Sequence, residues 1–409
     1  MMKRVVITGM GGITALGNDW STIQKRLKAK HNAVQNMPEW SEIEGLNTNL
    51  AAPINDFMLP EHYTRKKIRG MGRVSLMAVR ASELALNQAG LLNDPLLTSG
   101  QVGVAYGSST GSTKATQEFL TMLEDKNIYG ITATIYIQMM PHTTAVNIGL
   151  FFGLAGRIIP TSTACTSGSQ AIGYGYEAIK HGYQTIMVVG GGEELCPSEA
   201  AVFDTLFATS QKNDTPQLTP RPFDKDRDGL VIGEGAATLI LEELEHAKAR
   251  GATIYAEVVG FATNCDATHI TQPNMATMQV CMAQSVAQSG ISVGEIGYIS
   301  AHGTATDRGD IAESLATAAL FGNNVPISSL KSYYGHTLGA CGALEAWLSI
   351  EMMNANWFAP TINLDSPDPL CAELNYLMGD GKELDIEYLQ SNNFAFGGIN
   401  TSLIIKRWL

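Results

Sequence analysis

The chain has 409 residues, enough for two or three domain-sized units with a large hydrophobic core. Hydrophobic residues make up 45% and charged residues 16% of it, which is typical of a soluble globular protein. The net charge of −12 argues against nucleic acid as a partner, and no apolar run is long enough to span a membrane. We therefore expect a cytoplasmic protein without membrane insertion.

The six cysteines are scattered along the chain and form no CxxC pair, so the spacing predicts neither a zinc site nor any other metal site. Such a distribution is typical of reduced thiols in a cytosolic protein. The cysteines are Cys165, Cys196, Cys265, Cys281, Cys341 and Cys371.

Short β-branched runs alternate with segments of helical period in the first part of the chain, which predicts an α/β fold with buried strands. We expect strands at residues 4–10, 102–109, 157–164, 185–192 and 236–244, and helices at 73–90 and 169–182.

From about residue 254 the order of elements restarts. Strands are expected at 254–262, 296–303, 325–330, 389–398 and 401–409, with a Gly/Ala-rich helix at 337–355. The sequence therefore predicts two similar α/β halves, residues 1–250 and 251–409, joined by a charged surface helix.

A basic stretch stands out against the acidic background at residues 65–73. It is either a solvated surface or a docking patch for an acidic partner, which a local basic field would attract. Its basic residues are Arg65, Lys66, Lys67, Arg69 and Arg73.

Cys165 follows a predicted strand directly and precedes a predicted helix. A free cysteine is most often a buried core residue. A helix N-terminus, however, favours a thiolate, and its free N–H groups can hold a developing oxyanion. This stretch alone leaves both interpretations open.

Two histidines, His302 and His336, also follow predicted strands, and each alone would more often be a structural residue. Lys331 and Glu345 flank His336 and are either surface residues or a functional pair. Ligands collect at strand ends in α/β sheets, and one cysteine with two histidines suits acyl transfer through a thioester. Thr304 and Thr306, two positions apart, would hydrogen-bond an amide-bearing ligand arm.

The sequence resembles the β-ketoacyl-[acyl-carrier-protein] synthases, particularly the elongating type II class. The resemblance covers essentially the whole chain and is carried by "RVVITGMGGITALGN", "TACTSGSQ", "RPFDKDRDGLVIGEGAA", "AHGTATDRGD", "KSYYGHTLGACG" and "FAFGGIN". It implies a thiolase-like fold with five layers, α-β-α-β-α, and a decarboxylative Claisen condensation of an acyl thioester with malonyl carrier protein. It implies no metal or organic cofactor, because the substrates are carried on phosphopantetheine.

The resemblance also implies roles for individual residues. Cys165 would be the acylated nucleophile, while His302 and His336 would promote decarboxylation and stabilise the enolate. Lys331 and Glu345 would hold the charge network. The remaining roles are an oxyanion hole from the N–H groups of Cys165 and Phe396, a gate at Phe396, pantetheine contacts from Thr304 and Thr306, and residues near the gate at Asp266 and His269.

Some positions depart from the family pattern and favour a specialised ketosynthase, for example of an aryl polyene pathway. Ala395 precedes the gating Phe396, and the acyl pocket is expected to contain Thr110 and Met139. Phe207 stands where the family often has an arginine near the carrier-protein footprint. The alternatives are a housekeeping fatty-acid synthase, the active half of a heterodimer with a chain-length factor, and a thiolase using Cys341 as base. The implied partners are an acyl carrier protein and a second subunit, identical or chain-length-factor-like.

Overall fold

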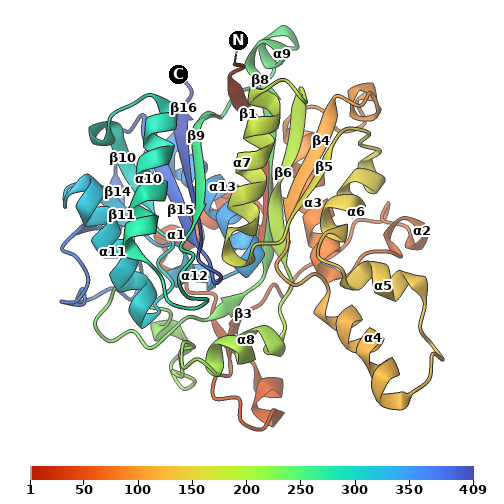
Figure 1. Ribbon diagram of the computed structural model, residues 1–409, viewed down its shortest axis with the longest axis horizontal. Coiled ribbons are helices and arrows are strands. Elements are labelled where there is room, and N and C mark those ends of the chain that lie inside the picture. The colour runs from red at the N-terminus through yellow and green to blue at the C-terminus, as the bar shows by residue number, and fades with distance from the viewer. Residues whose placement is uncertain (1) are drawn as a thin grey trace.

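The computed structural model describes residues 2–409 and is built on one mixed sheet of eleven strands (Figure 1). The strand order is β13-β11-β10-β15-β16-β9-β1-β8-β6-β4-β5. The first half of the chain supplies β1 (Val5–Thr14), β4 (Val102–Gly107), β5 (Ile158–Thr161), β6 (Ile186–Glu193) and β8 (Gly235–Glu243). The second half supplies β9 (Ala256–Cys265), β10 (Ile296–Ser300), β11 (Pro326–Ser328), β13 (Asn375–Tyr376), β15 (Tyr388–Phe394) and β16 (Ile399–Arg407).

The two halves of the sheet have the same topology. Counted within each half, the strands follow the order 3-2-4-5-1, and the second half adds β13 at its outer edge. The pairing directions also match: strand 5 is antiparallel to strands 1 and 4, and strand 2 is parallel to strands 3 and 4. The prediction of two similar α/β units therefore agrees with the observed topology.

Helices form three layers, one between the two halves of the sheet and one outside each half. In Figure 1, α7 (Ser167–Lys180) and α13 (Cys341–Asn354) lie between the two halves of the sheet, and each contacts strands of both. Helices α3 (Arg73–Gln88) and α6 (Thr143–Phe152) cover the outer face of the first half, while α10 (Met275–Ser289) and α11 (Asp307–Phe321) lie outside the second. The five expected layers are present, with one difference: Val5 of β1 pairs with Val258 of β9, which joins the two β layers into one sheet.

Glycines allow α7 to pack between the two halves. A Cβ on Gly173 would lie 2.2 Å from the Phe261 ring of β9, and a Cβ on Gly175 would lie 2.3 Å from Val189 of β6. Any larger residue at these positions would push one half of the sheet away from the helix. The glycines therefore fix the position of the α7 N-terminus, which follows Cys165.

The shorter elements complete the chain. The helices are α1 (Trp20–Lys28), α2 (Arg65–Ile68), α4 (Thr113–Asp125), α5 (Ala133–Met139), α8 (Pro197–Asp204), α9 (Leu244–Ala249) and α12 (Lys331–Tyr334). The strands are β2 (Gln35–Asn36), β3 (Leu50–Ala52), β7 (Ile232–Gly233), β12 (Trp357–Phe358) and β14 (Lys382–Glu383). Within residues 2–409, no helix is both long enough and apolar enough to cross a membrane.

Candidate active site

Cys165 lies in a tight turn between β5 and α7. The expected strand 157–164 is shorter in the structure, because a 3₁₀ turn over Ala164–Thr166 precedes the helix and Ala164 has a positive φ of 51°. The same arrangement precedes α13, where a 3₁₀ turn begins at Leu338 with a φ of 44°. The two turns touch, since the Cys341 thiol donates to the Cys165 carbonyl oxygen at 3.1 Å. Equivalent turns of the two halves therefore meet at the nucleophile candidate.

His336 is the nearest histidine to the sulfur. Its Nε2 lies 3.1 Å from Cys165 Sγ, and its Nδ1 accepts a hydrogen bond from the Leu338 N–H at 3.1 Å. Because Nδ1 is an acceptor, the hydrogen of the neutral ring is on Nε2 and points at the sulfur. Burial and the Lys331 charge hold the pKa of His336 well below its usual value, so the ring is neutral.

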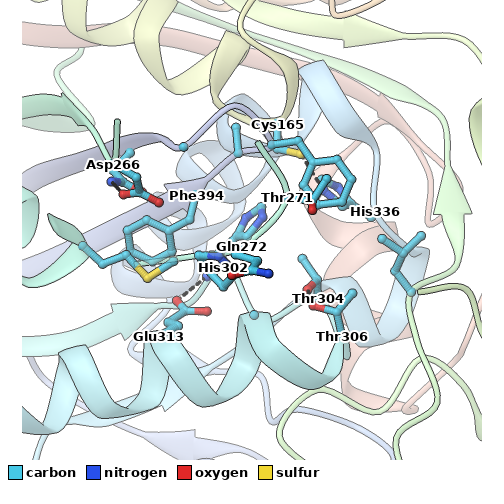
Figure 2. A pocket seen from close by; sticks show the side chains of 18 of the residues that line it. Cys165, Asp266, Thr271, Gln272, His302, Thr304, Thr306, Glu313, His336 and Phe394 are labelled. Atoms are coloured by element: carbon cyan, nitrogen blue, oxygen red, sulfur yellow. Dashed lines mark hydrogen bonds between the residues drawn. The ribbon is translucent and has the colours of Figure 1, made fainter. Parts of the chain in front are cut away.

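His302 has a similar arrangement next to His336 in the lining of the same cavity (Figure 2). Its Nδ1 lies 3.2 Å from Lys331 Nζ and 3.4 Å from Asn393 Nδ2, both of which are donors, so its Nε2 also bears the hydrogen. Burial, Lys331 and His336 lower the pKa of His302 well below its usual value. The two rings are 5.2 Å apart and nearly perpendicular.

Lys331 and Glu345 form a buried ion pair directly behind His302. The second Glu345 oxygen accepts from Asn393 Nδ2 at 2.7 Å. Burial alone would lower the pKa of Lys331, but the Glu345 carboxylate raises it overall, so the lysine is charged. Of the two interpretations of Lys331 and Glu345, the structure shows the pair.

The Cys165 thiol differs from expectation. Burial raises its pKa to about 11, although the Lys331 charge and the backbone N–H groups of Phe396 and Cys165 act in the opposite direction. The position before a helix predicted a lowered pKa for this thiol, and that prediction is wrong, because the pKa is raised overall. The cysteine is 4% exposed, and the loss of solvation outweighs the amide groups. With this raised pKa, the Cys165 side chain is a neutral thiol at neutral pH.

The cavity in front of Cys165 is lined by both polar and aromatic residues. Thr304 and Thr306 lie at its α11 side, with their hydroxyls 2.9 Å apart (Figure 2). Phe394, Phe203 and Phe396 supply apolar walls. Such a cavity has hydroxyl groups for an amide-bearing arm and an apolar surface for an acyl chain.

The loop at residues 395–398 closes one side of this cavity. The Phe396 ring packs on Phe203 at 5.0 Å, and Gly397 and Gly398 follow with positive φ angles. Ala395 has no positive φ, so its Cβ is accommodated without backbone strain. Asp266 fixes the loop through its N–H, which donates to the Gly398 carbonyl at 2.7 Å. His269 is exposed and accepts only from nearby Thr271, outside the cavity lining.

Thr110 and Met139 lie away from the cavity in front of Cys165. Thr110 is exposed in the single chain, and its hydroxyl contacts Glu193 and Glu199. Met139 is half-buried at the end of α5. The structure thus does not bring these two expected pocket residues into contact with the Cys165 cavity.

The basic residues divide into two groups. Arg65, Lys66 and Lys67 are exposed on α2, and Arg69 is exposed just after it. Arg73 instead forms a bidentate ion pair with buried Glu234 at 2.7 and 2.8 Å. Phe207 is 85% exposed. The four exposed basic residues are available to a partner, whereas Arg73 holds α3 to the body of the protein.

Sequence reasoning missed several supporting residues. Buried Glu313 accepts from the N–H groups of His302 and Gly303, each at 2.7 Å, and Asp310 accepts from the Thr304 N–H at 3.0 Å. Asn393 joins Glu345 to His302. A signal existed in the sequence: Asp310 ends the motif "AHGTATDRGD", Glu313 lies three positions after it, and Asn393 directly precedes "FAFGGIN".

The donor atoms of Cys165, His302 and His336 lie within 4.8 Å of one another, so this set has the residue types and proximity of a zinc site. The nearby Lys331 ammonium disfavours a divalent cation there. The expectation of a reaction without a metal stays a prediction.

Comparison with known proteins gives this geometry a family. Residues 2–247 match the family described as "Beta-ketoacyl synthase, N-terminal domain", and residues 255–365 match "Beta-ketoacyl synthase, C-terminal domain". The chain belongs to the β-ketoacyl synthase family. It is 37% identical to "3-oxoacyl-[acyl-carrier-protein] synthase 2" of Synechocystis over 99% of this chain and 98% of the relative. These matches confirm the predicted enzyme class, a β-ketoacyl-[acyl-carrier-protein] synthase.

Solved structures of the family confirm the thiolase-like ketosynthase fold. A β-ketoacyl synthase from Burkholderia phymatum is 61% identical, with a TM-score of 0.99 and full coverage of both chains. The ishigamide ketosynthase/chain length factor is 30% identical, with a TM-score of 0.90 and full coverage of both chains. The AntDE:AntF complex, described as a type II polyketide synthase carrier protein with its ketosynthase, is also 30% identical, with a TM-score of 0.89 and full coverage. A housekeeping role is thus not favoured over a specialised one.

Proposed function

We propose that this ketosynthase catalyses a two-stage condensation in which Cys165 carries the growing chain. In the first stage, the thiol attacks an acyl thioester, and its proton passes to the departing phosphopantetheine sulfur. The N–H groups of Cys165 and Phe396 hold the oxygen that becomes negative. The thiol needs to lose its proton only as the leaving sulfur gains one, which suits a resting pKa of about 11.

In the second stage, the two histidines act as hydrogen-bond donors. The carbonyl oxygen of a malonyl thioester accepts from the Nε2–H groups of His302 and His336, and CO₂ leaves as the enolate forms. The enolate carbon attacks the acyl–Cys165 carbonyl, and the sulfur departs as a thiolate that takes up one proton from solvent water. The observation that carries this proposal is the shared tautomer, because both Nδ1 atoms are occupied as acceptors. Both Nε2 hydrogens can therefore turn to one substrate oxygen, that of His336 by leaving its contact with Cys165 Sγ.

The proposal includes roles for further residues and for two partners. Lys331 and Glu345 keep His302 neutral and oriented, while Thr304 and Thr306 contact the pantetheine arm. An acyl carrier protein, acidic by class, docks on Arg65, Lys66, Lys67 and Arg69 of the α2 region, and the enzyme works as a homodimer or with a chain-length-factor-like partner. Neighbours that are ketosynthase–chain-length-factor complexes support a specialised pathway such as aryl polyene synthesis.

Mass spectrometry of Cys165 after incubation with acyl thioesters tests the proposal. Acyl groups should add to Cys165, and malonyl thioester should then extend them by two carbons with release of CO₂. Cys165→Ala should abolish acylation and condensation while keeping the melting temperature close to that of the wild type. Condensation by Cys165→Ala would refute the nucleophile assignment, and faster loading of saturated medium chains than of unsaturated or aryl-primed ones would refute the specialised pathway.

A further inference from the structure

Three polar side chains, Glu193, Thr110 and Glu199, form a hydrogen-bonded row outside the lining of the Cys165 cavity. The Thr110 hydroxyl oxygen lies 3.0 Å from Glu193 Oε1 and 2.8 Å from Glu199 Oε1. A hydroxyl group has one hydrogen, so it can donate to only one of these carboxyl groups. The other contact therefore requires a hydrogen on a carboxyl oxygen.

The surrounding hydrogen bonds show which carboxyl group carries that hydrogen. Glu193 also accepts from the Ser108 hydroxyl at 2.9 Å and from the backbone N–H groups of Ser109 at 2.8 Å and Gly339 at 3.0 Å. Such a set of donors favours a carboxylate at Glu193. Glu199 has no such donors, and burial together with the nearby Glu193 raises its pKa well above the usual value. The Glu199 carboxyl group therefore donates a hydrogen bond to the Thr110 hydroxyl, which in turn donates one to the Glu193 carboxylate.

This direction leaves one polar atom of Glu199 without a partner. Oε1 is the hydroxyl oxygen that donates to Thr110, so Oε2 is the carbonyl oxygen and can only accept. Among the described residues, no donor reaches Glu199 Oε2, and the residue is 4% exposed. An unpaired buried acceptor costs about 1–3 kcal/mol, which a donor on a ligand would recover.

The position of Glu199 connects it to the acyl site. Phe203 lies four residues further along α8 and therefore on the same helix face. Phe203 lines the cavity that contains Cys165 and packs on Phe396, and it belongs to one apolar cluster with Leu338 and Ala200. Four helical residues span about 6 Å. An acyl chain that leaves Cys165 along Phe203 would reach Glu199 about one helical turn further.

We propose that Glu199, held by Thr110, forms the polar end of the acyl-binding site and accepts a hydrogen bond from a hydroxyl group at the far end of the acyl chain. The substrate class is thus an acyl thioester with a terminal alcohol or phenol. This inference rests on the proposed function, because it requires Cys165 to carry the chain.

Acylation rates of Cys165 with matched pantetheine thioesters test the proposal. One pair is 8-hydroxyoctanoyl and octanoyl pantetheine, and the other is 4-hydroxycinnamoyl and cinnamoyl pantetheine, so the two arms separate an alcohol from a phenol. We expect the hydroxylated member of at least one pair to acylate Cys165 about tenfold faster, the effect of one buried hydrogen bond. Equal rates within both pairs would overturn the proposal.

Variants at position 199 separate hydrogen bonding from shape. In Glu199→Gln, the amide N–H donates to Thr110 and the carbonyl still accepts, so the preference should remain. In Glu199→Leu the acceptor is lost, and the preference should disappear. Val202→Ala, on the exposed face of the same helix, is the matched control and should behave as wild type. Loss of the preference in Glu199→Gln would overturn the assigned direction, even if Glu199→Leu fails to fold.

The same acylation rates distinguish failure of the ketosynthase function from failure of the hydroxyl-binding role of Glu199. If none of the four thioesters acylates Cys165, the proposed function fails and this inference fails with it. If octanoyl and cinnamoyl groups load as fast as their hydroxylated counterparts, the ketosynthase function stands and only the polar end of the site is refuted.

Discussion

The N–H of Leu338 donates to Nδ1 of His336 at 3.1 Å, although the two residues are only two positions apart. Leu338 can direct its amide back at the ring because it has a φ of 44°, at the start of the 3₁₀ turn before α13. The backbone thus selects the tautomer of His336 and points its Nε2 hydrogen at Cys165. The positive φ of Leu338 therefore determines which ring nitrogen of His336 can donate a hydrogen bond.

The first prediction concerns this Nε2 hydrogen. His336→Ala removes one of the two proposed donors to the enolate oxygen, and loss of one oxyanion donor typically costs about 10²–10³-fold in rate. We expect malonyl decarboxylation, measured as CO₂ release, to fall by that amount. His336→Gln, which keeps an N–H near Nε2, should retain more activity than the alanine variant. Decarboxylation by His336→Ala at the wild-type rate would show that the donor is not used.

The second prediction concerns the pH dependence of Cys165. Only the thiolate reacts with iodoacetamide, and a thiol with a pKa of about 11 ionises more with each pH unit below that value. Alkylation of Cys165, followed by peptide mass spectrometry, should therefore rise about tenfold per unit between pH 6 and pH 9. The modified peptide should be absent in Cys165→Ala. A plateau below pH 8 would mean that the helix N-terminus does lower the pKa, as the sequence first suggested.

The layered fold could be predicted because its signals are local. Apolar runs, helical period and terminal glycines mark β4, α3 and α7 within a few residues of their observed bounds. The junction between Val5 and Val258 could not be predicted, since backbone pairing between distant strands leaves no pattern in side chains. The approach of Cys165, His302 and His336 was predictable from strand ends, but the two tautomers were not. They depend on the backbone of Leu338 and the distant amide of Asn393.

The third prediction concerns the buried pair of Lys331 and Glu345. Lys331→Met leaves the Glu345 charge buried and unpaired, and breaking such a pair costs about 3–5 kcal/mol. The double variant Lys331→Met/Glu345→Leu removes both charges and should recover much of that loss. Urea unfolding of the three proteins at one pH measures the difference. A double variant less stable than Lys331→Met would show that the pair itself, rather than the unpaired charge, dominates.

The fourth prediction separates two residues of one basic stretch. Lys66 is exposed on α2 without an ion pair among the described residues, whereas Arg73 is bound to Glu234, 161 positions away in sequence. Lys66→Glu should raise KM for an acidic carrier protein with little change in kcat, and the effect should shrink at high salt because ions screen surface charges. Arg73→Ala should instead lower the melting temperature, because it leaves buried Glu234 without its cation. Steady-state kinetics at low and high salt, with thermal unfolding of both variants, distinguishes the two roles. An Arg73→Ala protein with wild-type stability and a raised KM would place Arg73 in the docking surface after all.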